Sequence, residues 1–185
     1  MEKSKNKIIN DEYLNKENIA SIRKHLKANG IVMLNEFLDV SEFRKLKEVN
    51  RKLKFKKYYD PTICNYSIFY KKTSNFKAIK KYIELICGKK LNDNCQIIKA
   101  KKGNYTLIED GQKQSKSYEA IFDFTKNWAK TYGGLVNYRF FDKDEVVQIP
   151  SSENSLVIIN ANKSKKYIKK INHTAKGERL FMSFY

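Results

Sequence analysis

The second half of the sequence is divided into short segments in which apolar and polar residues alternate with the period of two that is typical of β-strands. Turn-forming residues such as Gly103, Pro150 and Gly177 separate these segments. The predicted strands are residues 95–99, 104–108, 118–124, 135–141, 145–149, 155–160, 167–171 and 180–185. A succession of about eight short strands favours a sandwich or a jelly roll.

The first half of the sequence has the period of a helix instead. Apolar residues recur at helical spacing in residues 19–29, 41–54 and 76–87, and a short buried strand is expected at residues 31–34. Helices followed by strands indicate an α+β fold. We therefore expect a single domain over residues 1–185. Residues 1–95 should be mainly helical and basic, and should pack outside a jelly roll formed by residues 96–185.

Positive charge is concentrated in two blocks of the chain. The formal net charge is +18, yet residues 103–162 contain 6 basic and 8 acidic residues. Residues 41–102 contain 18 basic and 5 acidic residues, and residues 163–179 contain 7 and 1. A general preference for lysine codons would spread lysine evenly along the chain. The uneven distribution therefore predicts a surface that binds a polyanion, with nucleic acid favoured over an anionic membrane.

Aromatic residues are interleaved with the basic residues. The first block contains RKLKFKKYYD (residues 51–60) and FYKKTSNFKAIKKY (residues 69–82), and the second contains NKSKKYIKK (residues 162–170). Cations that meet phosphates, beside rings that stack on unpaired bases, are typical of RNA-binding surfaces. The simpler alternative is that the rings belong to the core and the lysines are only solvated. The residues predicted to contact RNA, in the first place ribosomal RNA, are Arg44, Lys45, Arg51, Lys52, Lys54, Lys56, Lys57, Lys80, Lys81, Lys163, Lys165, Lys166, Lys169 and Lys170.

Nothing in the sequence indicates a membrane or a secretory route. No apolar run reaches the roughly 18 residues of a membrane span. The charged start MEKSK differs from a signal peptide. The three cysteines form no CxxC pair and are expected to be reduced core residues. We therefore expect a cytoplasmic protein without a membrane partner, and a homodimer remains open.

The order of the predicted elements resembles the 2-oxoglutarate- and Fe(II)-dependent dioxygenases, in particular the branch related to prolyl hydroxylases. The entry helix, first strand and second helix of that family are similar to LKANGIVMLNEFLDVSEFRKL. Its His-x-Asp strand and the Gly-Gly turn that follows are similar to NYTLIEDG and FDFTKNWAKTYGGLVNY. Its last three strands are similar to QIPSSENSLVIIN and YIKKINHTAKGERLFMSFY. The resemblance covers about residues 19–185 and implies a double-stranded β-helix.

The same resemblance implies an iron site that this sequence has lost. The family binds Fe(II) through two histidines and one carboxylate, which leaves positions open for oxoglutarate and oxygen. In the best register the first histidine corresponds to Glu109, the aspartate to Gly111 and the second histidine to Lys166. The oxoglutarate-binding arginine remains, as Arg179. We therefore expect a protein without catalysis or cofactor, whose remnant pocket contains Tyr105, Glu109, Asp110, Gly111, Lys166, His173 and Arg179.

Two other functions remain open from these residues. If Glu109, Asp110 and His173 converge, they form a replacement triad, and the chain is an Fe(II)- and oxoglutarate-dependent hydroxylase of a basic or ribosome-associated protein. Adjacent residues of a strand point to opposite faces, so this convergence requires a bulge at the two acids. Alternatively, Arg179 alone holds a small carboxylate in a metal-free pocket.

Overall fold

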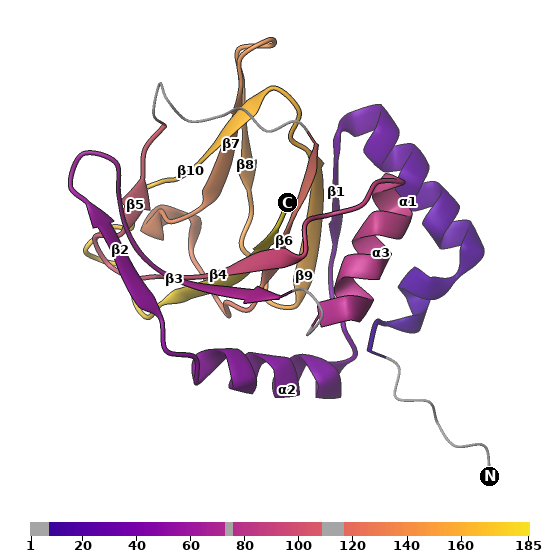
Figure 1. Cartoon of the computed structure of the whole chain (residues 1–185), viewed down its shortest axis with the longest axis horizontal. Coiled ribbons are helices and arrows are strands. Elements are labelled where there is room, and N and C mark those ends of the chain that lie inside the picture. The colour runs from indigo at the N-terminus through magenta and orange to yellow at the C-terminus, as the bar shows by residue number, and fades with distance from the viewer. Residues whose placement is uncertain (1–7, 73–75, 109–116) are drawn as a thin grey trace.

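The computed structural model of the chain describes residues 8–72, 76–108 and 117–185. Within these residues two antiparallel sheets face each other, and three α-helices lie on the outside of the larger sheet (Figure 1). The helices are α1 (Lys16–Asn29), α2 (Val40–Arg51) and α3 (Lys77–Cys87). Two 3-10 helices, η1 (Asp11–Leu14) and η3 (Lys130–Tyr132), complete the helical part.

The larger sheet combines strands from both halves of the chain. Its order is β1-β9-β6-β11-β4-β3-β2, and β5 pairs separately with β3. The strands are β1 (Ile31–Leu34), β2 (Lys56–Asp60), β3 (Cys64–Lys72), β4 (Asn94–Ala100), β5 (Tyr105–Thr106), β6 (Tyr118–Asp123), β9 (Ser155–Asn160) and β11 (Arg179–Phe184). The last strand, β11, lies between β6 and β4, so its side chains are in the middle of the protein.

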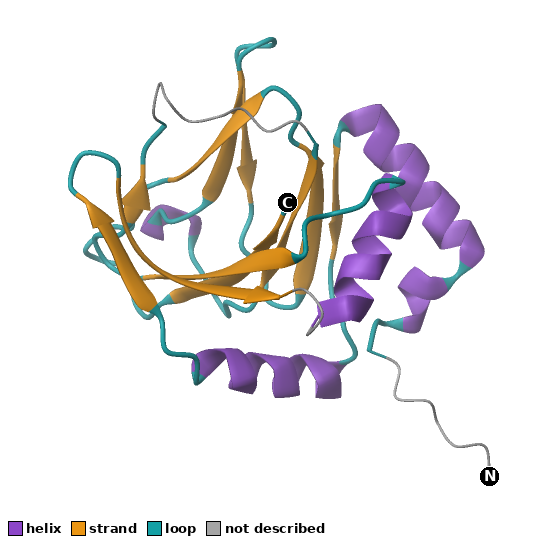
Figure 2. Cartoon of the chain, viewed as in Figure 1, coloured by secondary structure: helices purple, strands orange, loops and turns teal. Residues whose placement is uncertain are grey.

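The smaller sheet covers the other side of the barrel (Figure 2). It contains β7 (Val136–Phe140), β8 (Glu145–Ile149) and β10 (Ser164–Ile168), in the order β10-β7-β8. The backbone N–H of Ile168 donates to Thr106 Oγ1 at 2.6 Å, which ties β10 to β5 and therefore joins the two sheets. The two sheets form a double-stranded β-helix, so the predicted α+β jelly roll is confirmed.

Alternation along the strands of the larger sheet creates two separate cores. Phe122 and Met182 face the helices and pack in the outer core. Ile121 and Phe181, one residue away on the same strands, face the smaller sheet and pack in the inner core. Because neighbouring residues of a strand point to opposite faces, any polar residue in register with Ile121 or Phe181 is held inside the barrel.

The structure differs from the predicted elements chiefly at three places. The strand predicted at residues 104–108 is reduced to β5, Tyr105–Thr106. Residues 1–95, expected to be mainly helical, also contain β2 and β3, which extend the edge of the larger sheet. The strand β10 begins at Ser164 and ends at Ile168, whereas residues 167–171 were predicted. Beyond Ile168 the backbone bonds to loops: Lys169 O accepts from Gly134 N, and Ile171 N donates to Asn104 O.

The cysteines have the predicted character of core residues. Cys64 and Cys95 are buried, Cys87 is half-buried, and all three are free thiols. Burial raises the pKa of Cys95 to about 11 and that of Cys87 to about 12, so both thiols stay protonated at neutral pH. Among the described residues, no helix combines the length and the apolar character needed to cross a membrane.

Candidate functional site

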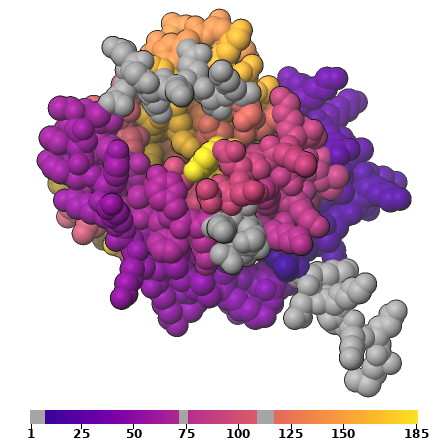
Figure 3. Space-filling model, in the orientation of Figure 1, coloured from indigo at the N-terminus to yellow at the C-terminus, as the bar shows by residue number. Residues whose placement is uncertain are grey.

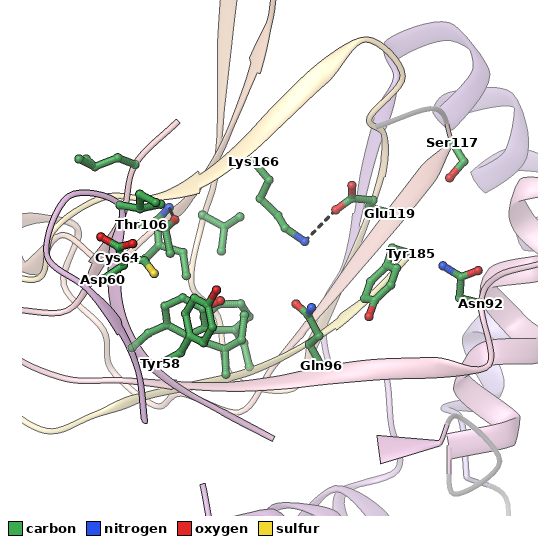
Figure 4. A pocket seen from close by; sticks show the side chains of 17 residues that line it. Tyr58, Asp60, Cys64, Asn92, Gln96, Thr106, Ser117, Glu119, Lys166 and Tyr185 are labelled. Atoms are coloured by element: carbon green, nitrogen blue, oxygen red, sulfur yellow. Dashed lines mark hydrogen bonds and ion pairs between the residues drawn. The ribbon is translucent and has the colours of Figure 1, made fainter. Parts of the chain in front are cut away.

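A cavity of about 520 Å³ opens between the two sheets at one end of the barrel (Figure 4). We name it the mouth cavity. The C-terminal residues, which include Tyr185 of the cavity lining, are visible in yellow near the middle of the face shown in the space-filling view (Figure 3). Its buried apolar lining includes Ile98, Val136, Ile168 and Phe181. Its polar lining includes Tyr58, Asp60, Asn92, Gln96, Ser117, Glu119, Lys166 and Tyr185.

An ion pair between Lys166 and Glu119 joins the two sheets inside the mouth cavity (Figure 4). Lys166 Nζ of β10 lies 3.0 Å from Glu119 Oε2 of β6 and 3.0 Å from Ser183 Oγ of β11. The hydroxyl of Tyr138 donates to the same carboxylate oxygen at 2.9 Å. Glu119 is only 7% exposed, and the Lys166 side chain is 24% exposed. The cavity therefore contains an ammonium and a carboxylate that already neutralise each other.

Tyrosine hydroxyls near this pair remain protonated. Burial raises the pKa of Tyr66 to about 12 and also raises the pKa of Tyr185. The pKa of Tyr138 is raised well above its ordinary value, first by burial and then by the negative charge of Glu119. At neutral pH all three phenols are therefore protonated; Tyr66 and Tyr185 line the mouth cavity, whereas Tyr138 is fully buried behind Glu119, to which its hydroxyl donates.

Arg179 lies deeper in the barrel and is held by the protein itself. Its side chain is fully buried, and Nη2 donates to Asp123 Oδ2 at 2.9 Å. Its Nη1 donates to the carbonyl oxygen of Gly134. Asp123 also accepts hydrogen bonds from the Thr125 backbone N–H at 2.7 Å and from the Ser151 hydroxyl at 2.8 Å. Arg179 does not line the mouth cavity, so its charge is used inside the fold.

Of the described members of the predicted remnant pocket, which are Tyr105, Lys166, His173 and Arg179, Lys166 alone lines the mouth cavity. Tyr105 is half-buried in β5, and its hydroxyl donates to Pro61 O at 2.7 Å. His173 is exposed in the turn between β10 and β11. Glu109, Asp110 and Gly111 lie outside the described residues. Within the part of the chain that the structure describes, no three His, Cys, Asp or Glu side chains are grouped so that they could hold a metal ion.

Glu119 and Asp123, the two acids that pair with Lys166 and Arg179, were not among the predicted site residues. Both belong to β6, where Ile121 stands between them, and both are buried. A signal for them was present in YEAIFD, because two carboxylates on one face of an otherwise apolar strand need cationic partners when they are buried.

Most residues predicted to contact RNA are on the surface, but three are not. Lys165 is buried, with Nζ 5.5 Å from the centre of the Phe141 ring. Lys166 points into the mouth cavity, and half-buried Lys80 bonds to Asp93 at 2.7 Å. These three lysines therefore do not contribute to an outer basic surface, which corrects the prediction. The exposed members are Arg44, Lys45, Arg51, Lys52, Lys54, Lys56, Lys57, Lys81, Lys163, Lys169 and Lys170.

The chain passes from α2 through a short loop into β2 at the edge of the larger sheet (Figure 1). One group of exposed cations belongs to these two elements and the loop between them. We name it the α2–β2 surface; its members are Arg44, Arg51, Lys54, Lys56 and Lys57. In the described part of the chain none of these five has a carboxylate within 4.0 Å. By contrast, Lys45 and Lys52 of the same segment form ion pairs with Glu42 at 2.6 Å and Glu48 at 3.2 Å.

Exposed tyrosines accompany these cations. Tyr58 and Tyr59 of β2 are 54% and 58% exposed, and Tyr70 of β3 is 62% exposed. For these three rings the alternative of a core position is therefore wrong, whereas half-buried Phe55 packs against the outer core. Lys57 Nζ lies 4.8 Å from the centre of the Tyr59 ring. Lys57 and Tyr59 therefore share one face of β2, whereas Tyr58 points to the opposite face and lines the mouth cavity.

Comparison with known proteins identifies the fold. No protein-family model and no curated protein sequence matches the chain. Its structure is similar to a Pseudomonas putida prolyl-4-hydroxylase, with 16% identity, 90% of this chain and 96% of that chain covered, and a TM-score of 0.66. It is also similar to a Trichoplax adhaerens prolyl hydroxylase solved with a hypoxia-inducible-factor peptide, with 12% identity, 94% of both chains covered, and a TM-score of 0.67.

A third similar structure is a 2-oxoglutarate-Fe(II) oxygenase-family oxidoreductase from Burkholderia pseudomallei, with 11% identity, 92% and 91% coverage, and a TM-score of 0.66. Such a similarity over nearly whole chains defines the architecture, although the identities are low. The chain therefore has the double-stranded β-helix fold of the 2-oxoglutarate- and Fe(II)-dependent oxygenases, as the resemblance in the sequence implied.

Among the described residues no three side chains are grouped to ligate the iron of that fold family, and Glu109 and Gly111, which correspond to two of its ligands, lie outside them. An iron centre needs three ligands that leave open positions, whereas Lys166, which corresponds to the second histidine, is an ammonium paired with Glu119 and offers no lone pair to a metal. Oxoglutarate needs a cation for its distal carboxylate, whereas Arg179 is already paired with Asp123. Of the three guanidinium nitrogens of Arg179, Nε alone has no hydrogen-bond partner among the described residues, and the side chain is fully buried.

Proposed function

We propose that this chain is a non-catalytic protein on an oxygenase fold that binds structured RNA through its α2–β2 surface. The observation that carries the proposal is the set of five exposed cations without a carboxylate partner in the described residues, together with the exposed ring of Tyr59 beside Lys57. Phosphates neutralise such cations and release counterions, and unpaired bases stack on exposed rings. Ribosomal RNA is the structured RNA that we expect as partner, with a cytoplasmic location.

The mouth cavity supports the non-catalytic part of the proposal. Fold does not determine function, so the residues at the site carry more weight than the architecture. Lys166 and Glu119 neutralise each other within the cavity, and Asp123 neutralises Arg179. These four charges stabilise the barrel from inside, which leaves the exposed surface as the place where a charged partner binds.

A triple substitution of Lys54, Lys56 and Lys57 with glutamine tests RNA binding. We expect the affinity for a fluorescein-labelled RNA hairpin, measured by fluorescence anisotropy at about 0.1 M salt, to fall about 100-fold, because three phosphate contacts are lost. Tyr59→Ala should weaken binding by about 1–3 kcal/mol if a base stacks on the ring.

The control for this experiment is a triple glutamine variant of Lys16, Lys24 and Lys27, which are exposed on α1 and carry the same total charge. It should bind the RNA hairpin nearly as well as the wild type. Equal losses of affinity in both triple variants would mean that RNA binding depends only on net charge. Unchanged affinity in the variant of Lys54, Lys56 and Lys57 would refute the proposed surface. Sedimentation of the wild-type chain with ribosomes at low salt tests the expected partner.

A second candidate is an Fe(II)- and oxoglutarate-dependent hydroxylase that acts on a basic or ribosome-associated protein. The structural comparisons favour this candidate over RNA binding, because the matched structures are described as hydroxylases or oxygenases and none of the reported descriptions names RNA. Its metal ligands would have to include Glu109, Asp110 and His173, of which only His173 belongs to the described residues, where it is exposed.

Anaerobic titration with Fe(II) and oxoglutarate distinguishes the two candidates. We expect no charge-transfer absorption, and no release of succinate after oxygen is added, because the described residues supply no set of three ligands. Micromolar affinity for Fe(II) that disappears in Glu109→Ala and in His173→Ala would decide for the hydroxylase. The same titration of His25→Ala, which removes the other histidine of the chain from an exposed position on α1, controls for adventitious binding.

A further inference from the structure

A second cavity, of about 480 Å³, lies on the outer face of the larger sheet beside the end of α2. Ile98 of β4 lines the mouth cavity, whereas its neighbour Lys99 lines this second cavity. Likewise, Phe181 of β11 lines the mouth cavity and its neighbour Leu180 lines the second cavity. Because successive side chains of a strand point to opposite faces, the sheet itself separates the two cavities. We name the second one the basic cavity.

Cations from four separate segments converge on the basic cavity. They are Lys47 and Arg51 of α2, Lys99 of β4, Lys126 of the loop after β6, and Lys176 of the loop before β11. Among the described residues that line the cavity, Glu178 is the single carboxylate. The two basic blocks of the sequence, residues 41–102 and 163–179, do not fully explain why these cations meet. Lys126 comes from residues 103–162, which carry more acidic than basic groups.

Only part of this positive charge is neutralised within the protein. Lys47 forms an ion pair with Glu153, which lies outside the lining, and Lys99 Nζ lies 3.8 Å from Glu178 Oε2. Over the described ranges of the chain, no carboxylate lies within 4.0 Å of the remaining three cations, which are Arg51, Lys126 and Lys176. An excess of three positive charges therefore surrounds a concave surface.

The three cations without a carboxylate partner in the described residues, Arg51, Lys126 and Lys176, are exposed at the rim of the basic cavity. Lys47 and Lys99, which are only 16% and 29% exposed, lie beside them, each offset by a glutamate. Apolar side chains, among them Phe124 and Leu180, form part of the wall. Like charges that are held together beside an apolar wall repel one another, and a multivalent anion that binds between them removes this repulsion.

We propose that the basic cavity is a binding site for phosphate groups that carry two or more negative charges in total. A phosphate presents acceptor oxygens in several directions and can therefore meet cations from several segments at once. The phosphates come either from a free phosphorylated small molecule or from RNA. The inference goes beyond the proposed function, because the basic cavity shares only Arg51 with the α2–β2 surface. The basic cavity could still bind phosphate if RNA did not bind at the α2–β2 surface.

Titration calorimetry of the full chain with inorganic pyrophosphate tests this site. We expect binding at about 0.1 M salt, and the double variant Lys126→Gln/Lys176→Gln should bind about tenfold more weakly or worse. Both lysines are exposed, so their replacement should leave the fold intact. The control is Lys24→Gln/Lys27→Gln on α1, which makes the same change in net charge and should keep the wild-type affinity.

Absence of pyrophosphate binding by the wild-type chain, or equal losses in the two double variants, would overturn the proposal. The fluorescein-labelled RNA hairpin then identifies the source of the phosphate. If Lys126→Gln/Lys176→Gln weakens both pyrophosphate and the hairpin, the cavity takes phosphates of RNA. If it weakens pyrophosphate alone, the ligand is a free phosphorylated molecule. RNA binding at the α2–β2 surface is tested with Lys54, Lys56 and Lys57, and the basic cavity with Lys126 and Lys176. The proposed function and the proposed phosphate site can therefore fail independently.

Discussion

Replacing Arg179 with methionine should lower the free energy of unfolding by about 3–5 kcal/mol, since it leaves the buried carboxylate of Asp123 without a counter-charge. A loss of this size is a large fraction of the roughly 5–15 kcal/mol that stabilises a typical domain. Urea unfolding followed by circular dichroism measures it, with the midpoint and the slope compared between variant and wild type.

Arg139→Met is the matched control for this prediction. Arg139 Nη2 lies 2.7 Å from Asp144 Oδ1, but the two side chains are 45% and 86% exposed. Water screens such a pair, so its loss should change stability by less than about 1 kcal/mol. If Arg179→Met were as mild as Arg139→Met, the pair of Arg179 and Asp123 would not support the barrel, and Arg179 would have to be considered again as a ligand-binding group.

The pair also has a consequence for oxoglutarate. A carboxylate that binds Arg179 as in the fold family would have to displace Asp123, which also accepts hydrogen bonds from Thr125 and Ser151. Removing Asp123 from these donors would leave buried polar groups without partners. Asp123 therefore forms with Arg179 the ion pair that the carboxylate of a bound ligand would otherwise form.

The architecture of residues 95–185 could be predicted because the strands there alternate clearly and turn residues separate them. The edge strand β2 could not, since Lys56, Lys57, Tyr58 and Tyr59 are all exposed and give no apolar–polar alternation. Its partner β3 had a usable signal, because apolar or aromatic residues at Cys64, Tyr66 and Ile68 alternate with polar ones. The pairing of β3 with β4 is a long-range contact that no local pattern contains.

The candidate site was predictable only in part. The resemblance to the oxygenases identified two residues of the site. Lys166 stands where that family has its second histidine, and Arg179 corresponds to the family's oxoglutarate-binding arginine. Their partners depend on how strands pair: Phe181 lies opposite Asp123 in the register of β11 and β6, which brings Arg179 near that carboxylate. The basic cavity was missed for the same reason, since Lys99, Lys126 and Lys176 are distant in sequence and meet only in the folded protein.

Raising the salt concentration should weaken RNA binding steeply if the α2–β2 surface meets phosphates. For about six neutralised phosphates, the affinity should fall about 10³-fold between about 50 and about 200 mM monovalent salt, because bound counterions are no longer released into a dilute solution. The five members of the surface and neighbouring exposed lysines can supply this number of contacts. Anisotropy titrations of the RNA hairpin at several salt concentrations give the slope of log affinity against log salt.

The slope separates contacts with phosphates from a general attraction by net charge. Each lysine that meets a phosphate contributes about 0.7–0.9 to the slope, so Lys54→Gln/Lys56→Gln/Lys57→Gln should reduce it by about 2–3. The triple variant of Lys16, Lys24 and Lys27 on α1 has the same net charge and should keep the wild-type slope. A shallow slope in the wild-type chain, or the same slope in both triple variants, would show that these lysines do not contact RNA. The concentration of lysine in residues 41–102 would then require an explanation other than RNA binding at this surface.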